Sequence, residues 1–528
     1  MVIIIFSYMR LFLFAIGGTG ARVVRSLTMM LASGIDGLDS STEIIPIIID
    51  FDKSNGDKDR AINALDSYVK IHNQLYPNAI KGTIYDSHYF MTTIQSLKNT
   101  GVINGGPQMQ KDYEIIFDQS NQVNEFSKDL GLDGMVSNPA EKMTMDLFHT
   151  LYDDSPKTSS TTELNLNLNV GFKGNPNIGS VVFHELRNMP ELQRFFTTFN
   201  ASQGDKVFIV SSIFGGTGSS GFPEIVNAIR SHNNEFIKSA VIGSAVVLPY
   251  FDVNTQNNQS GNNTGAINSS TFPSKSVAAL TYYSDRINNT VNAIYYVGDE
   301  NHDSYDYSEG SQTQQNKAHV VEVVAATAII DFLKRNVTLS DHNAYEFGIK
   351  DEKKNESILY PDFYQETHRL ILDRLSAFAL GVKFYRDRIC GDRSQESKNT
   401  AYYSNNGFSL ASKLHDGVFQ TFDEFIDTQY DNGASDHWGF YPWLNELVQH
   451  AHKLDLFKFD RNIELKDILS YQAGQHGGFF DRFKSSPASD SNFSGAMNAK
   501  SKNLPSYSES DFFKVLHDVS EEIFNALK

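Results

Sequence analysis

Residues 206–226 join an apolar segment to a run of Gly, Ser and Thr, a composition suited to binding an anion. The segment reads KVFIVSSIFGGTGSSGFPEIV, and its first half is typical of a buried β-strand. Glycines let an anion approach the backbone, the N–H groups that open a following helix point at it, and hydroxyl groups add donors. An ordinary strand-to-helix turn is the alternative for a single loop of this kind. The candidate phosphate contacts are Gly215, Gly216, Thr217, Gly218, Ser219 and Ser220.

A second loop of the same kind lies near the N-terminus. Residues 10–27 read RLFLFAIGGTGARVVRSL, an apolar strand pattern followed by a helical pattern that begins at Ala21. Between the two patterns stand the second set of candidate phosphate contacts, Gly17, Gly18, Thr19 and Gly20. Two loops able to bind phosphate make a shared site a better interpretation than two unrelated turns.

Two carboxylates follow the next apolar strand. Residues 43–52, EIIPIIIDFD, form a continuous apolar run typical of a strand in a parallel sheet, and they end in Asp50 and Asp52. Ligands of open parallel sheets bind beyond the carboxyl ends of the strands, so these acids and both glycine loops are expected in one crevice. Carboxylates beside phosphates favour Mg²⁺ between them. The alternative is that both acids cap the following helix.

A third loop precedes the 206–226 segment. Residues 159–179 alternate polar and apolar residues and then break at several glycines and a proline, which indicates an exposed strand and a turn. Its position in the chain would let Lys173 or its backbone reach a terminal phosphate, with a plain surface turn as the alternative.

Composition limits the class of protein and its partners. The chain has 528 residues, 40% of them hydrophobic, enough for a large core in more than one domain. Its net charge of −18 argues against nucleic acid and anionic membranes as partners. Cys390 is the only cysteine, which excludes an intrachain disulfide and favours the cytoplasm. Arg10 interrupts the N-terminal apolar run, so we expect a buried strand there rather than a membrane segment, with residues 1–8 as an optional extension.

The order of these pieces resembles the tubulin and FtsZ superfamily of GTP-binding proteins. FGGTGSSG is similar to the family's GGGTGTG-like loop, GGTGARV to its first glycine-rich turn, and DFD to its acidic second loop. The apolar helical pattern NKAHVVEVVAATAIIDFLKRN, residues 316–336, looks like the core helix that joins the two family domains. The resemblance covers roughly residues 9–336.

The resemblance implies a fold and a set of domains. We expect a Rossmann-like α/β parallel sheet of tubulin/FtsZ type in residues 1–315, followed by the core helix at 316–336. A mostly helical C-terminal domain would occupy residues 337–484, and residues 485–528 would hold a Ser-rich linker and a terminal amphipathic helix.

The resemblance also implies ligands. GTP or GDP would bind with its phosphates on the two glycine loops, Asp50 and Asp52 would sit near Mg²⁺, and Asn316 would contact guanine. Arg22 stands where the family has an Asn, and we count it among the nucleotide-binding residues. The family's ribose-binding Glu has no clear counterpart in this chain, so the resemblance supports nucleotide binding more strongly than it supports guanine.

Catalysis is where the chain departs most from the family, whose acids lie on a loop after the core helix and enter the site of the next subunit. The NxDxxD pattern of that loop is missing. YPDFYQET, residues 360–367, offers Asp362 and Glu366 as displaced catalytic acids, or as plain exposed acids. We therefore expect a slow GTPase that forms homo-oligomers or filaments and hydrolyses GTP only on self-assembly.

Two other functions remain open. A nucleotide-bound scaffold without hydrolysis would recruit a protein partner through the C-terminal helices. A NAD-dependent Rossmann enzyme would use Asp50 to hold the ribose, but Val23 stands where the third glycine of GxGxxG belongs, and the 206–226 loop would have no role. A Walker-type ATPase is disfavoured because GxxxxGK[ST] does not occur.

Overall fold

The computed structural model describes residues 9–35, 38, 42–52, 54–77, 88–99, 113–115, 126–130, 138–152, 166, 168, 171–172, 174–254, 269–300, 303–306, 314–346, 349, 357–390, 398–405, 408–427, 438–458, 463–469 and 486–528.

An eight-stranded parallel sheet forms the centre of the molecule, which confirms the predicted α/β class. Its order is β10-β8-β6-β5-β1-β2-β3, with β4 also paired to β2, and every ladder is parallel. The strands are β1 (Met9–Ile16), β2 (Thr42–Ile49), β3 (Thr93–Ile94), β4 (Glu114–Ile115), β5 (Lys206–Ser212), β6 (Val241–Val247), β8 (Ala293–Val297) and β10 (Asn343–Glu346).

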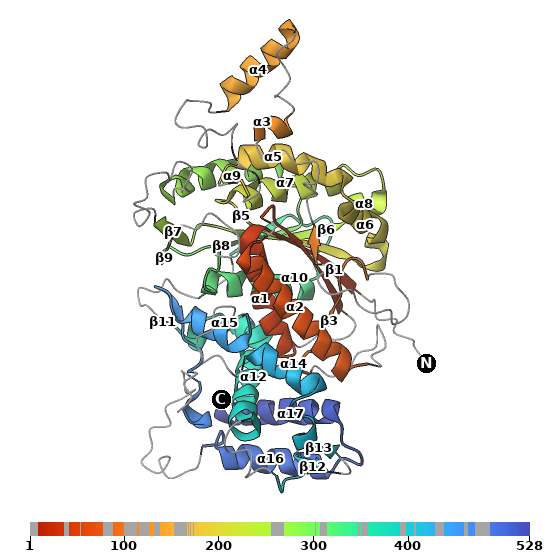
Figure 1. Ribbon diagram of the computed structural model, residues 1–528, viewed down its shortest axis with the longest axis vertical. Helices are drawn as coiled ribbons and strands as arrows, with labels where there is room; N and C mark the ends of the chain where they lie inside the picture. Colours follow the sequence, from red (N-terminus) through yellow and green to blue (C-terminus); the bar gives the residue numbers. More distant parts are fainter. Residues whose placement is uncertain are drawn as a thin grey trace.

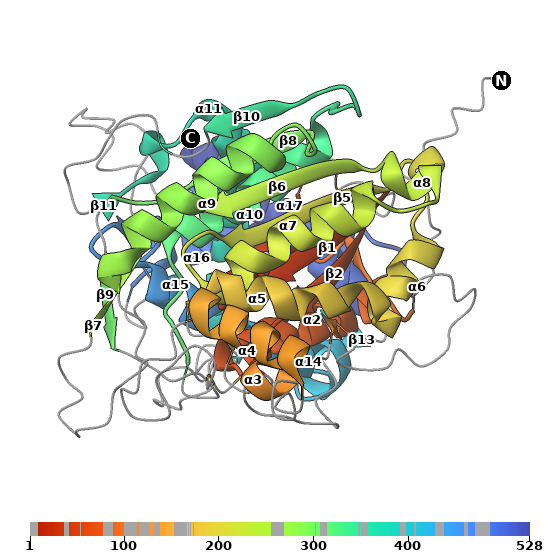
Figure 2. The ribbon, with the colours of Figure 1, turned by 90° about the horizontal axis from the view of Figure 1, so that it is seen from above.

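Helices cover both faces of this sheet (Figure 1). In β1, Leu11 and Leu13 enter one apolar cluster and Phe12 and Phe14 enter the other, because successive side chains of a strand point to opposite faces. One face carries α1 (Gly17–Ala32), α2 (Gly56–Leu75) and α10 (Val320–Lys334); the other carries α5 (Pro176–Phe183), α6 (Pro190–Thr198), α7 (Gly216–Arg230) and α9 (Phe272–Arg286). Figure 2 shows α5, α7 and α9 crossing above the strands.

The apolar helix predicted over residues 316–336 is shorter than its sequence pattern indicated. It spans Val320–Lys334, and every residue except Lys334 is buried. His319 is its N-cap, accepting a hydrogen bond from the Val321 N–H, and Glu322 completes a capping box. Asn316 therefore precedes the helix instead of opening it.

The C-terminal third is mostly helical and continues the apolar cluster of α1, α2 and α10. Its main helices are α12 (Asp373–Phe384), α14 (Gly417–Ile426), α15 (Phe440–Leu447), α16 (Asp490–Lys502) and α17 (Glu509–Leu527). Smaller elements are α3 (Phe126–Asp129), α4 (Pro139–Leu151), α8 (Glu235–Lys238), α11 (Gln365–Thr367), β7 (Phe251–Asn254), β9 (Asp303–Asp306), β11 (Ser357–Ile358), β12 (Ser404–Asn405), β13 (Phe408–Ser409) and β14 (Lys453–Leu454).

The expected Ser-rich linker contains a helix. α16 begins after Ser489, whose hydroxyl accepts from the Asn492 N–H, and it buries Phe493 and Met497. These two residues are four positions apart and lie on one face, so packing against the body outweighs the low helix propensity of Ser and Gly. The terminal helix α17 packs on α12 and α16.

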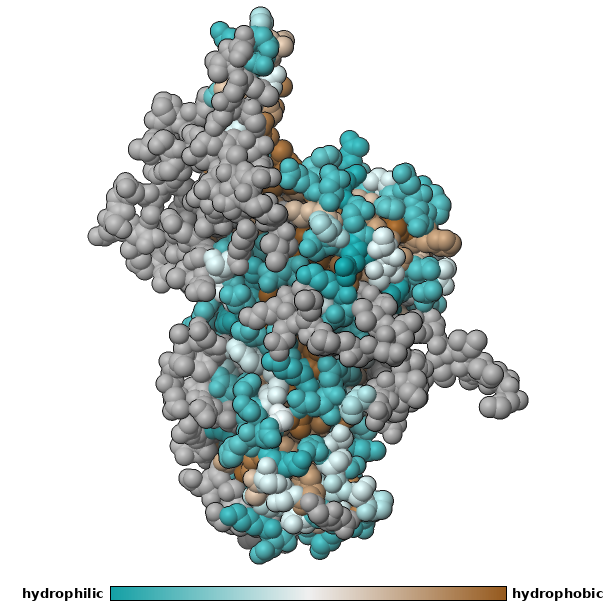
Figure 3. All heavy atoms as spheres, turned by 45° about the vertical axis from the view of Figure 1, so that its right-hand side comes forward, coloured by the Kyte–Doolittle hydropathy of each residue, from teal (hydrophilic) through white to brown (hydrophobic). Residues whose placement is uncertain are grey.

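The surface is polar over most of the described residues in view (Figure 3). An exception is α4, which projects from the body and exposes Met143, Leu147 and Leu151. Among the described residues, no helix combines the length and the apolar character needed to cross a bilayer.

Candidate functional site

The two glycine loops meet at the point in the sheet where the direction of the strand connections reverses. From β1 the chain continues through α1 to β2 on one side, and from β5 it continues through α7 to β6 on the other. Because α1 and α7 lie on opposite faces, the loops after β1 and β5 diverge at the carboxyl ends of the strands. Open parallel sheets bind ligands at this position, which is called the crevice below. This is the place that the sequence predicted for the ligand.

The loops touch through Gly17 and Thr217. Gly17 has φ +71°, a left-handed conformation that disfavours other residues. A Cβ on Gly17 would lie 3.5 Å from Cβ of Thr217 and 3.8 Å from the backbone nitrogen of Gly218. Residues 17 and 217 therefore form the contact between the first and second predicted phosphate loops.

Other glycines of the second loop serve close packing. A Cβ on Gly218 would lie 2.5 Å from the carbonyl oxygen of Ser212, so glycine lets α7 pack directly on the end of β5. A Cβ on Gly216 would lie 2.8 Å from Cβ of Phe172 and 3.1 Å from the backbone nitrogen of Asn175. The third predicted loop thus packs on the second. Lys173 itself lies outside the described residues.

Three loop positions remain open to solvent: Gly18, Gly215 and Thr217 are half-buried, while Thr19 and Gly20 are buried. Neither α1 nor α7 has an acidic residue in its first turn, so the positive ends of both helix dipoles are not neutralised by their own side chains. The open positions are where an anion can meet backbone N–H groups.

The two serines of the second loop bond within their own helix. The hydroxyl of Ser219 donates to the carbonyl of Gly215, and that of Ser220 donates to the carbonyl of Gly216 at 2.7 Å. Such contacts to the residue four positions back use the hydroxyl protons. In this conformation, the loop offers a ligand its backbone and the hydroxyl of Thr217 rather than these two serines.

The predicted acids lie at the end of β2. Asp50 accepts hydrogen bonds from the Asp52 N–H at 3.1 Å and from Nδ2 of Asn55 at 3.0 Å. Burial raises the pKa of Asp50 to about 7, although these hydrogen bonds and the charge of Lys58 act in the opposite direction. Asp52 is buried and accepts from the Ser54 N–H. The nearby ammonium of Lys58 is paired with Glu114 at 2.8 Å, so a divalent ion beside Asp50 would add a counter-charge for the ionised carboxylate.

Two carboxamides that the sequence did not single out converge on Gly18. A Cβ placed there would lie 3.3 Å from Nδ2 of Asn55 and 3.5 Å from Nε2 of Gln314. The position of Asn55, as N-cap of α2 directly after the acidic strand end, was a usable signal. Gln314 lies in a loop whose sequence gives no such signal, and only the tertiary structure brings it here.

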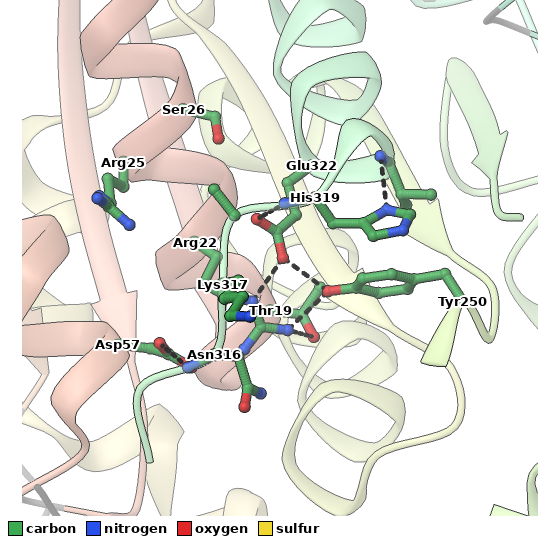
Figure 4. A network of polar contacts seen from close by, with 12 residues as sticks. Thr19, Arg22, Arg25, Ser26, Asp57, Tyr250, Asn316, Lys317, His319 and Glu322 are labelled. Atoms are coloured by element: carbon green, nitrogen blue, oxygen red, sulfur yellow. Dashed lines mark hydrogen bonds and ion pairs between the residues drawn. The ribbon is translucent and has the colours of Figure 1, made fainter. Parts of the chain in front are cut away.

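Arg22 lies at the centre of a buried polar network (Figure 4). Its guanidinium donates to Oε1 of Glu322 at 2.5 Å, to Oδ2 of Asp57 at 2.7 Å and to the hydroxyl of Tyr250 at 2.6 Å, with Thr19 at 3.3 Å. Burial alone would lower the pKa of Arg22, but Tyr250 and the two carboxylates outweigh it and raise the pKa. The predicted nucleotide contact is thus engaged in joining α1, α2 and α10.

Asn316 enters the same network through its backbone. Its N–H donates to Oδ1 of Asp57 at 3.0 Å, and its carbonyl accepts from the guanidinium of Arg60. The side chain points away from the network in Figure 4. The predicted guanine contact is therefore held by its main chain beside the crevice, with its carboxamide turned elsewhere.

The candidate catalytic acids lie near the β10 edge of the sheet, whereas the glycine loops follow the central strands β1 and β5. Asp362 ends a 3₁₀ turn and accepts from the Leu359 N–H, and Glu366 is exposed in α11. The neighbouring Phe363 bridges to Ile349, just after β10. Strands β8 and β6 separate β10 from β5, so the structure does not bring these acids to the crevice of the same chain.

No protein-family model matches the chain, and no similarity to a curated protein was found. Solved structures with a distant likeness include a point mutant of FtsZ from M. jannaschii (13% identity, TM-score 0.24, 55% of this chain and 46% of that one). A CetZ from Methanosaeta thermophila has 11% identity and a TM-score of 0.23, and the match covers 55% of this chain and 45% of that one. GDP-bound CetZ1 from Haloferax volcanii has 12% identity and a TM-score of 0.23, and the match covers 55% of this chain and 51% of that one. The chain spans about half the length of each.

Removing the charge of Arg22 should destabilise the fold. We expect Arg22→Met to lower the free energy of unfolding by about 3–5 kcal/mol, because buried Glu322 loses its ion pair with Arg22 and buried Asp57 keeps only the pair with Arg60. Lys238→Ala, which breaks the exposed pair with Glu235, is the control and should change it by less than about 1 kcal/mol. Chemical denaturation measures both. Equal, small losses would show that Arg22 is not needed for stability.

Proposed function

We propose that the crevice between the loops after β1 and β5 binds the phosphates of a guanine nucleotide. The observation that carries the proposal is the meeting of two glycine-rich helix N-termini, α1 and α7, at the switch point of a parallel sheet. Backbone N–H groups at Gly18, Gly215 and Thr217 would contact the phosphates. The choice of guanine rests on the sequence resemblance of FGGTGSSG and GGTGARV.

Mg²⁺ would be held beside the phosphates by Asp50 and Asp52. Both carboxylates lie at the carboxyl end of β2, the strand next to β1, and Asn55 links Asp50 to the surroundings of Gly18. Mg²⁺ keeps several water ligands and binds through one or two carboxylates, which suits this pair. When bound, the ion would neutralise phosphate charge, and the residues of the chain would orient the nucleotide.

Hydrolysis would depend on self-assembly. Asp362 and Glu366 lie at the β10 edge, away from the crevice of their own chain, so they can act on a nucleotide only in a neighbouring copy. Phosphoryl transfer depends mainly on positioning and charge neutralisation, so an isolated chain with bound nucleotide would turn over slowly. A scaffold that binds nucleotide without hydrolysis is the alternative outcome.

The first test identifies the nucleotide and its position. We expect nucleotide released from the purified, denatured protein to be GDP or GTP, and we expect Gly18→Val to lower GDP affinity at least about 100-fold, or about 2.7 kcal/mol. Gly18 is the position to change because a new side chain meets mainly the ends of Asn55 and Gln314, whereas at Gly218 it would strike backbone.

Gly495→Val is the matched control, since a Cβ there meets nothing within 4 Å. Calorimetry measures affinity, and thermal unfolding confirms that each variant is folded. Recovery of NAD, or protection by NAD and not by GDP, would favour the Rossmann enzyme instead. Unchanged GDP affinity in Gly18→Val would remove the first loop from the site.

The second test uses the pKa of Asp50. Its folded pKa of about 7 lies above that of the unfolded chain, so ionisation as pH rises destabilises the fold unless a cation binds. Protons should therefore compete with Mg²⁺, and affinity for Mg²⁺-nucleotide should fall by up to about tenfold from pH 8 to pH 6. Asp50→Asn should lower affinity at pH 8 and flatten this slope. The same slope with EDTA present would contradict the assignment.

The third test asks whether hydrolysis needs two copies. Phosphate release should rise more steeply than linearly with protein concentration. Gly18→Val and the double variant Asp362→Ala/Glu366→Ala should each be inactive alone, yet a mixture should regain activity, because one chain supplies the acids and the other the nucleotide. Release that is linear in concentration would exclude coupling to assembly, and no release at any concentration would favour the scaffold.

A further inference from the structure

Two histidines and an aspartate from three separate segments meet beside the Arg22 network, where the rings of His319 and Tyr250 lie 5.0 Å apart. Asp303 begins β9, His319 caps α10, and His450 follows α15. One ligand-type atom of each residue lies within 4.8 Å of the others. Both histidines are buried, and Asp303 is half-buried. The cluster therefore joins the α/β part of the chain to the C-terminal helices.

The contacts of His450 place two lone pairs against each other. Its Nε2 lies 2.7 Å from the carbonyl oxygen of Ala318, so this nitrogen carries a proton and donates. In a neutral ring, Nδ1 then has a lone pair, and it lies 2.9 Å from Oδ2 of Asp303. A cation between Nδ1 and Oδ2 is required to make this contact favourable.

The geometry allows a metal ion as that cation. Oδ2 of Asp303 faces a ring nitrogen of each histidine, at 2.9 Å from Nδ1 of His450 and 3.4 Å from Nε2 of His319. A carboxylate and a neutral imidazole are the forms in which these side chains bind metals.

His319 supplies a third ligand atom. Its Nε2 is fully buried, has no hydrogen-bond partner among the described residues, and lies 3.4 Å from the same Oδ2 of Asp303. Its Nδ1 accepts from the Val321 N–H at 3.1 Å, which puts the ring proton on Nε2. For Nε2 to bind a metal, its proton would have to move to Nδ1, which then no longer accepts from the Val321 N–H, so this capping bond would be lost and the two N–H groups would have to move apart.

We infer that Asp303, His319 and His450 bind a divalent transition-metal ion that pins the C-terminal helices to the α/β part. Two imidazoles and one carboxylate suit Zn²⁺ or Fe²⁺ and not Mg²⁺ or Ca²⁺, which prefer oxygen ligands. Outer contacts that orient ligands are in place: the Ala318 carbonyl accepts from His450, and the Ala451 N–H donates to Oδ1 of Asp303 at 2.8 Å. Water would complete the coordination.

Zinc titration of the untagged, full-length chain after chelator treatment tests the site. We expect one equivalent of Zn²⁺ per chain and a rise in Tm on zinc addition. Asp303→Asn and His450→Ala should each lower zinc affinity at least about 100-fold, with thermal unfolding in chelator showing that both variants fold. His452→Ala is the matched control, since His452 lies on the same segment but pairs with Asp299; its affinity should match the wild type.

Three results would overturn the inference. One is the absence of a zinc equivalent in the wild-type chain, and another is equal zinc affinity in the wild type, Asp303→Asn and His450→Ala. The third concerns the thermal stability of the chain, if it does not respond to chelator or zinc but depends on pH in the wild type and not in His450→Ala. That result would show that the cation between Nδ1 and Oδ2 is a proton.

Discussion

The buried charge network around Arg22 is the constraint on which the candidate site depends. Arg22 lies just after the first glycine loop and binds Asp57 of α2 and Glu322 of α10. Asp57 also binds Arg60, and Arg60 shares Glu446 of α15 with Arg25. Buried ion pairs often contribute little net stability relative to apolar packing, but loss of one partner is costly. The network thus fixes the positions of α1, α2, α10 and α15 relative to one another.

This network places the glycine loops without using their side chains. α1 is held by Arg22 one turn after Gly18, so the backbone N–H groups of its first turn keep one direction toward the crevice. α7 is placed differently: Gly218 lets it lie directly on the end of β5, and Gly216 receives the third loop. Rigid placement of backbone donors reduces the ordering cost of binding an anion.

The C-terminal helices are joined to the sheet by polar contacts as well as by the apolar cluster. Glu446 accepts from the Ala318 N–H, His450 contacts Asp303 and Ala318, and His452 pairs with Asp299. All three side chains come from a single stretch at the end of α15. Apolar packing is non-directional, whereas these contacts require one orientation, so they select how the helical part sits on the sheet.

The sequence by itself determined the parallel α/β class, the two glycine loops and the acidic end of β2, because strand composition and turn chemistry are local properties. It missed the helix within the expected linker, where burial of Phe493 and Met497 outweighs propensity. The ligand roles predicted for Arg22 and Asn316 stay predictions, but the sequence did not reveal the protein contacts of Arg22, since its partners are 35, 228 and 300 residues away. Only the tertiary structure decided the ion pairs of Arg22 and the proximity of Asp303, His319 and His450. Ion pairs and clusters of possible ligands depend on distance in space and leave no periodic pattern along the chain.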